Sequence, residues 1–138
     1  MPTKSVIVNT SGEAFYDITE SVKREATKLI NSQEGLLYIF TVHTSCALTC
    51  NEAFDPSAKI DMEEFMKHLA PRNLKFITHT AEGPDDSPSH MKSILLNQNL
   101  CFPVINNKLQ LGTWQGIYLA EFRDGTRDRS ILIKYISG

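Results

Sequence analysis

The chain has 138 residues, enough for one domain with a substantial hydrophobic core, and we treat residues 1–138 as a single domain. Its 14 basic and 16 acidic side chains give a net charge of −2, which excludes the strongly basic surface expected of a protein that binds nucleic acid or anionic membranes. No apolar run approaches the roughly 20 residues of a membrane-spanning helix. The N-terminal segment MPTKSVIVNT lacks a signal-peptide pattern, so we expect a cytoplasmic protein.

The first third of the chain predicts a strand, a helix and a second strand. SVIVNT, residues 5–10, is typical of a strand. Residues 17–35 have the apolar spacing of an amphipathic helix, with Asp17 at its start and Gly35 at its stop. LLYIFTVH, residues 36–43, is apolar on both faces and predicts a central strand.

Two further helices are predicted from their start signals. Asp55 is placed as an N-cap and Pro56 as the first helical residue of a helix through Leu69. Its inward stripe is expected to consist of Met62, Phe65, Met66 and Leu69. His68 beside this stripe is interpreted as structural. Ser87 and Pro88 open a shorter helix.

The last third predicts strands at residues 100–105, 109–112, 114–122 and 130–136, separated by the turns NNK and DGTRD. Trp114 is expected in the core. Five or more strands unevenly interleaved with about three helices favour an α+β domain with antiparallel sheets over a doubly wound parallel sheet.

The three cysteines, Cys46, Cys50 and Cys101, have neither the even number of a disulfide framework nor the spacing of a zinc motif. We interpret them as small buried thiols, with Cys46 beside His43 as the one candidate for a catalytic cysteine.

The first polar segment, HTSCALTCNEAFD (43–55), follows the apolar strand directly. His43 stands at the strand end, where a general base or metal ligand would be held rigidly. Thr44, Ser45 and Asn51 offer neutral hydrogen bonds, and Glu52 adds a carboxylate. The segment is either a polar loop that leads into a helix or one wall of a site, and we favour a functional role for His43 with Glu52.

The second polar segment, HTAEGPDDSPSHMK (79–92), surrounds a Gly-Pro turn with imidazoles and carboxylates. It contains His79, Glu82, Asp85, Asp86 and His90. Imidazole with carboxylate is a ligand set for zinc, and carboxylates also bind magnesium. The alternative is a solvated acidic loop beside a helix N-terminus. Because three of the four histidines lie in the two polar segments, we expect the fold to bring these segments together.

The third segment is GTWQGIYLAEFRDGTRDR (112–129). Alternation along a strand places Thr113, Gln115, Glu121 and Arg123 on one face. At about 3.3 Å per residue, Gln115 and Arg123 stand roughly 26 Å apart and cannot line one small pocket in one subunit. The three arginines near the hairpin tip are either a phosphate grip or an exposed turn. They are Arg123, Arg127 and Arg129.

Together, HTSCALTCNEAFDP, HTAEGPDDSPSHMK and LQLGTWQGIYLAEFRD resemble the YjbQ family, small bacterial and archaeal proteins labelled secondary thiamine-phosphate synthases. The resemblance covers nearly the whole chain in the same order. It implies an α+β fold with antiparallel sheets and a homotrimer with a cleft near the subunit boundary. This sequence departs from the pattern at Asp86, where many relatives have Asn.

Residues that match the family pattern receive roles by this resemblance. The expected catalytic residues are His43, Glu52, His90 and Arg123. The expected substrate contacts are Thr44, Ser45, Asn51, Thr113, Gln115 and Lys92. The expected ligands of a divalent metal, zinc or magnesium, are His43, His79, Glu82, Asp85 and His90.

Three functions remain open at this point. The family label implies that a pyrimidine diphosphate is joined to a thiazole phosphate with release of pyrophosphate, for which a metal or cationic side chains must stabilise the leaving group. The second is metal-dependent hydrolysis of a small phosphorylated or acyl substrate, with His43 or Glu52 activating a water. The third is a trimeric module that binds a small phosphorylated metabolite without turning it over.

Overall fold

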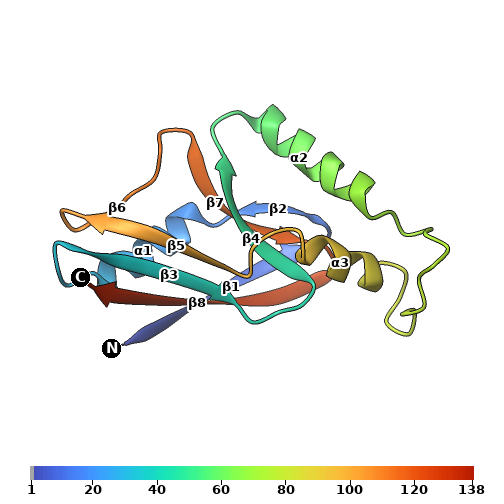
Figure 1. Ribbon diagram of the computed structural model, residues 1–138, viewed down its shortest axis with the longest axis horizontal. Coiled ribbons are helices and arrows are strands. Elements are labelled where there is room, and N and C mark those ends of the chain that lie inside the picture. Colours follow the sequence, from blue (N-terminus) through green and yellow to red (C-terminus); the bar gives the residue numbers. More distant parts are fainter. Residues whose placement is uncertain (1) are drawn as a thin grey trace.

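Eight strands and three helices form in residues 2–138, the part of the chain that the computed structural model describes (Figure 1). The strands are β1 (Thr3–Ser11), β2 (Ala14–Asp17), β3 (Glu34–Thr41), β4 (Cys46–Glu52), β5 (Asn99–Ile105), β6 (Lys108–Leu109), β7 (Gln115–Glu121) and β8 (Thr126–Ser137). The helices are α1 (Thr19–Leu29), α2 (Pro56–Leu69) and α3 (Asp86–Ser93). The expected α+β class with antiparallel sheets and about three helices is confirmed.

The strands form two antiparallel sheets that face each other. One has the order β1-β8-β3-β5-β6 and the other the order β2-β7-β4. The main core lies between them, where Ile131 and Ile133 of β8 pack with Ile117 and Leu119 of β7. Val22 and its neighbours on α1 close this core. Strand β3 is the middle strand of the larger sheet, as its apolar sequence predicts.

The opposite face of β7 packs against α2. Tyr118, Ala120 and Phe122 form a second cluster with Met66 of α2 and Phe15 of β2. Both faces of β7 are therefore buried, and the smaller sheet is the central layer between the larger sheet and α2 (Figure 1). Within the described residues, no helix is both long and apolar enough to span a membrane.

A buried ion pair joins the two sheets. Glu121 at the end of β7 is fully buried and Arg129 of β8 is 5% exposed. Arg129 donates from Nε to Glu121 Oε1 at 2.7 Å and from Nη2 to Oε2 at 2.6 Å. Thr10 of β1 donates to the same carboxylate at 2.6 Å, and Arg129 Nη2 also donates to Ser45 Oγ at 2.8 Å. Burial alone would favour the protonated acid, but these bonds outweigh it and lower the pKa of Glu121.

The helix predicted over residues 17–35 is too long. Helix α1 covers only Thr19–Leu29, and Ile30 has extended backbone angles. Gly35 lies in β3 rather than at a helix end, and it is required because a Cβ there would lie 2.4 Å from the carbonyl oxygen of Ile136. Asp17 does serve the helix start, since its Oδ1 accepts from the amide and hydroxyl of Thr19.

The polar segment after β3 is mostly a strand, not a loop. Strand β4 begins at Cys46 and pairs with β7 along its length. Its apolar side chains point alternately into the main core and into the second cluster, which stabilises the strand. Short strand β2 was not predicted at all. Of the cysteines, only Cys46 is buried, while Cys50 is half-buried and Cys101 is exposed.

Of the predictions for α2 and Trp114, the N-cap is confirmed, and the two on burial are wrong or only partly right. Asp55 caps α2 through a bond from the amide of Ser57, as expected. However, Phe65 is 61% exposed and Leu69 is 46% exposed, because α2 touches the smaller sheet chiefly through Met66. Trp114 is 56% exposed rather than buried in the core, since it precedes β7 at the open end of the sheet.

The ion pair gives the first testable prediction. Arg129→Met leaves the Glu121 carboxylate buried without its partner, and we expect a loss of about 3–5 kcal/mol in the free energy of unfolding. Glu121→Leu/Arg129→Met removes both charges and should lose clearly less. Lys28→Met breaks an exposed pair with Glu25 and serves as control, with an expected change below about 1 kcal/mol. Urea denaturation measures all three, and a double variant as unstable as Arg129→Met would contradict the prediction.

Candidate functional site

Two histidines and one aspartate meet at the N-terminal half of α3. Nε2 of His79 lies 2.7 Å from Oδ2 of Asp86, and Nε2 of His90 lies 3.2 Å from the same oxygen. One ligand atom from each residue lies within 4.8 Å of the other two. Asp86 and His90 share a face because they are four residues apart on a helix. His79 comes from the loop before the helix, and we call these three residues the His-Asp cluster.

The His-Asp cluster is oriented by hydrogen bonds from the first polar segment and from β7. Nδ1 of His90 donates to the carbonyl of Thr44 at 2.9 Å, which orients the ring with Nε2 toward Asp86. Nη1 of Arg123 donates to Oδ1 of Asp86 at 2.8 Å, which leaves Oδ2 toward the histidines. Metal sites use such outer hydrogen bonds to fix the tautomer and orientation of their ligands.

The donor set of the His-Asp cluster fits a transition metal. Two imidazole nitrogens and one carboxylate oxygen are a frequent three-ligand set for zinc and non-haem iron, with positions left for water or substrate. Asp86 is 4% exposed. Burial raises its pKa, but the hydrogen bond from His79 and the charges of His90 and Arg123 outweigh burial and lower it. Asp86 therefore stays ionised and able to bind a cation.

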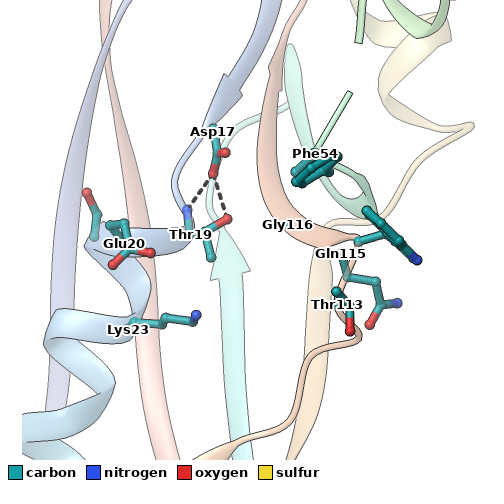
Figure 2. A pocket seen from close by; sticks show the side chains of 11 residues that line it. Asp17, Thr19, Glu20, Lys23, Phe54, Thr113, Gln115 and Gly116 are labelled. Atoms are coloured by element: carbon teal, nitrogen blue, oxygen red, sulfur yellow. Dashed lines mark hydrogen bonds between the residues drawn. The ribbon is translucent and has the colours of Figure 1, made fainter. Parts of the chain in front are cut away.

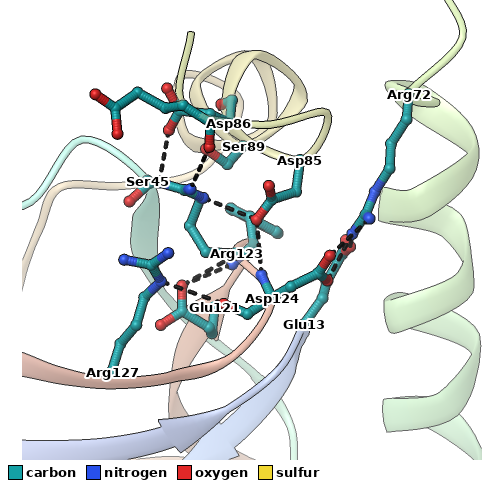
Figure 3. Close-up of polar contacts among 12 residues, drawn as sticks. Glu13, Ser45, Arg72, Asp85, Asp86, Ser89, Glu121, Arg123, Asp124 and Arg127 are labelled. Carbon is teal, nitrogen blue, oxygen red and sulfur yellow. Dashed lines mark hydrogen bonds and ion pairs between the residues drawn. The ribbon is translucent and has the colours of Figure 1, made fainter. Parts of the chain in front are cut away.

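Arg123 holds both aspartates of the second polar segment (Figure 3). Its Nε donates to Asp85 Oδ2 at 2.8 Å, and its Nη2 donates to the backbone carbonyl of Glu82 at 3.0 Å. The amide of Asp124 also donates to Asp85 Oδ2 at 2.8 Å. Burial opposes ionisation of Asp85, but these bonds hold its pKa at about 2. Asp85 and Arg123 thus organise the loop, and neither Asp85 nor Glu82 belongs to the His-Asp cluster.

His43 lies next to the His-Asp cluster but outside it. Its Nε2 accepts from the backbone N–H of Ser130 at 2.9 Å, so the neutral ring carries its proton on Nδ1. Burial and the nearby Arg129 lower the pKa of His43, which keeps it neutral at pH 7. His43, Thr44 and His90 line one cavity of about 530 Å³, whose apolar lining includes Ile94 and Leu96.

Two expected substrate contacts have structural partners instead. Ser45 is buried and its hydroxyl accepts from Arg129. Lys92 is 2% exposed, its Nζ lies 2.6 Å from Glu13 Oε2, and it lies over the ring of Phe122. Both side chains therefore already have partners within the protein.

Four further expected site residues lie at the far end of the smaller sheet. The register pairs Glu52 with Gln115 at one end of β4 and β7, and Cys46 with Glu121 at the other. Glu52 accepts from the amides of Phe54 and Asp55, and Asn51 accepts from the amide of Glu52. Thr113 and Gln115 line a separate cavity (Figure 2). Seven paired residues span roughly 20 Å, so within one subunit these residues do not reach the His-Asp cluster.

Sequence reasoning did not assign Asp86 as a ligand. The predicted helix opens at Ser87 and leaves Asp86 outside it, whereas α3 begins at Asp86 and so places Asp86 and His90 at i, i+4 spacing on one face. Sequence reasoning also missed Glu121 as the partner of Arg129, because that pairing depends on how the two sheets pack. Of the three hairpin arginines, Arg123 and Arg129 pair with carboxylates, whereas Arg127 donates to the backbone carbonyl of Asp124.

Comparison with known proteins gives the same family over almost the entire chain. The sequence model of the UPF0047 protein YjbQ-like family matches residues 4–138. The UPF0047 protein YjbQ of Salmonella typhimurium is 38% identical over 129 residues, which cover 94% of this chain and 93% of the relative. A UPF0047 protein of Methanocaldococcus jannaschii is 42% identical over 124 residues, 90% of this chain and 86% of the relative.

Solved structures have the same fold. An uncharacterized conserved protein of the YjbQ/UPF0047 family from Clostridium acetobutylicum superimposes with a TM-score of 0.86 at 34% identity, over 96% of this chain and 99% of that one. A hypothetical protein from Aeropyrum pernix K1 superimposes with a TM-score of 0.89 at 28% identity over all of both chains. These names describe a family and a fold, and they state neither a substrate nor a reaction.

Proposed function

We propose, from the premise that this chain belongs to the YjbQ-like UPF0047 family, that it is a metal-dependent enzyme acting on a small phosphorylated metabolite. The observation that carries the proposal is the His-Asp cluster, in which His79, Asp86 and His90 converge on one point. Two partly exposed imidazoles each direct a ring nitrogen at one buried carboxylate, which is the arrangement that a shared cation would require. The two imidazoles favour zinc over magnesium, which prefers oxygen ligands.

The surrounding residues supply the remaining functions of such a site. A divalent ion in the His-Asp cluster would supply positive charge to phosphate oxygens of a leaving group. His43 offers its Nδ1–H as a neutral donor beside the cluster. The adjoining cavity of about 530 Å³ is large enough for a small metabolite, and its apolar side suits a carbon skeleton rather than a second charge.

Transfer is the first candidate reaction. The sequence resemblance implies the joining of a pyrimidine diphosphate to a thiazole phosphate with release of pyrophosphate. In this reaction the leaving group gains negative charge, which the bound ion would stabilise. Thr44 and His90 border the cavity that would hold one of the two substrates.

Hydrolysis of a small phosphorylated or acyl substrate is the second candidate. One observation favours it: the arginines nearest the His-Asp cluster in residues 2–138 are bound by carboxylates of the chain itself. Arg123 pairs with Asp85 and Asp86, and Arg129 pairs with Glu121. In the transfer reaction, the diphosphate leaving group would therefore have only the metal ion to balance its negative charge. In hydrolysis, the attacking water is uncharged and needs no additional cation.

Self-association belongs to the same proposal. The outer face of the larger sheet exposes Ile7, Leu36, Leu132 and Ile136 at 37–55%. Apolar side chains exposed on this face favour its burial against another subunit. A homotrimer, as the family resemblance implies, would cover it and would place the cleft at a subunit boundary.

The homotrimer is tested by light scattering coupled to size exclusion. We expect the wild-type chain at three times its 15.5 kDa monomer mass. Leu132→Lys places a charge on the apolar face and should shift the mass toward the monomer. Ile60→Lys, on exposed helix α2, is the control and should leave the mass unchanged. A wild-type chain that runs as a monomer at all concentrations contradicts the assembly.

Metal binding is tested by competition with a chromophoric zinc chelator. We expect one zinc per chain, and we expect His90→Ala and Asp86→Ala to weaken it by more than the roughly 10–100-fold that loss of an outer hydrogen bond costs. His68→Ala is the matched control, because His68 is exposed on α2 and outside the cluster. Equal zinc affinity in His90→Ala and His68→Ala would refute the site.

Activity is tested by mixing the zinc-loaded protein with the pyrimidine diphosphate and the thiazole phosphate and measuring pyrophosphate. Transfer predicts pyrophosphate only with both substrates, and loss of it in His90→Ala. Hydrolysis predicts phosphate or acid release from single generic esters, abolished by chelator. If zinc binds, and a phosphorylated ligand shows saturable binding but is not consumed, the chain is a binding module and both reactions are excluded.

A further inference from the structure

A second cavity lies at the opposite end of the smaller sheet, away from the His-Asp cluster. It has a volume of about 310 Å³, at the small end of the range for ligand pockets. Phe54 lies across from Asp17, Glu20 and Lys23 (Figure 2). Trp114 also lines the cavity, and its ring contacts that of Phe54. We call it the aromatic cavity.

The aromatic wall is exposed yet held in place. Phe54 is 71% exposed and Trp114 is 56% exposed, and their rings meet edge to face with centroids 4.9 Å apart. The amide of Ala53 donates to the carbonyl of Trp114 at 2.9 Å, directly beyond the last pair of β4 and β7. The amide of Phe54 donates to Glu52 at 2.6 Å. A pair of exposed aromatic rings whose backbone is anchored by these bonds is a surface suited to a ligand.

The facing wall carries two carboxylates and one ammonium. Asp17 uses Oδ1 to accept from Thr19 at the start of α1. Glu20 and Lys23 extend from the first turns of α1 beside it (Figure 2). Gly116 forms the floor between the two walls, where a Cβ would lie 2.4 Å from that of Ala53. The wall therefore has a net charge of −1 across the cavity from the two aromatic side chains.

We propose that the aromatic cavity binds a small organic cation, a quaternary or protonated amine. The aromatic faces attract the cation through their quadrupoles, and the carboxylates of Asp17 and Glu20 complement its charge. An anion would be repelled by the two carboxylates and attracted only by Lys23. This site is independent of the His-Asp cluster, since the two lie at opposite ends of β4 and β7.

The experiment uses Trp114 as its reporter, because it is the only tryptophan in the chain. The full-length protein is titrated with choline and, in parallel, with 3,3-dimethyl-1-butanol, which has the same shape without the charge. We expect saturable quenching or shift of Trp114 emission by choline, with at least tenfold weaker binding of the neutral alcohol. Calorimetry on the same samples checks that the optical change reports binding.

Variants assign the binding to the two walls. Phe54→Leu and Glu20→Gln should each weaken choline at least threefold, whereas Glu25→Gln should not. Glu25 lies on the same helix but pairs with Lys28 outside the cavity. Binding should persist in His90→Ala, which separates this site from the metal site.

Three results overturn the proposal. The first is equal binding of choline and the neutral alcohol, which removes the role of charge. The second is unchanged choline affinity in both Phe54→Leu and Glu20→Gln. The third is a Trp114 emission that shifts with protein concentration in the absence of choline, because it would show that a second copy of the chain covers the aromatic wall.

Discussion

The buried contact between Glu121 and Arg129 is the constraint on which the site depends. A charge on β8 and a charge on β7 are both removed from water, which is unfavourable unless each is fully paired. The bidentate geometry, with Thr10 as a further donor to Oε1, meets that condition only when the two sheets lie in one relative position. Arg129 also binds the hydroxyl of Ser45 and thereby fixes the segment between β3 and β4. The ion pair thus also sets the position of the uncharged backbone groups in this segment.

That fixed segment carries the two groups that border the His-Asp cluster. Thr44 presents its carbonyl to Nδ1 of His90, and His43 is held by the amide of Ser130, the residue after Arg129. On the other side, Arg123 lies two residues beyond Glu121, and the Glu121 carboxylate also accepts from its amide. Arg123 then holds Asp85 and Asp86 in place (Figure 3). The groups on both sides of the His-Asp cluster are therefore positioned by the same buried ion pair, because they are bonded to it or lie only a few residues from it along the chain.

The sequence was sufficient for what depends on local patterns. It predicted the α+β class, the N-cap of α2 at Asp55, the central position of β3 and the proximity of His90 to the first polar segment. It failed where tertiary packing decides. Gly35 has the sequence features of a helix stop, yet it is glycine because β8 passes too close for a side chain. Arg129 has the pattern of an exposed turn, yet it is buried because Glu121, eight residues away, points into the same core. Residues 46–52 belong to a segment predicted as a polar loop or one wall of a site, yet they form a strand because Cys46, Ala47 and Leu48 point alternately into two cores.

The register of β4 with β7 also divides the residues that match the family pattern into two groups. Glu52 and Gln115 are paired at one end, beside the exposed rings of Phe54 and Trp114, whereas Glu121 lies at the other end with the His-Asp cluster. Both faces of β7 are buried between these ends, so no open path joins the two groups through the sheet. A single reaction that uses both groups therefore requires two subunits, with the aromatic end of one beside the histidines of another. If the groups act within one subunit, they form separate sites with opposite chemistry: a metal-centred site for anions and an acidic, aromatic site for cations. The arrangement of the subunits in solution is the physical variable that decides between one composite site and two independent ones.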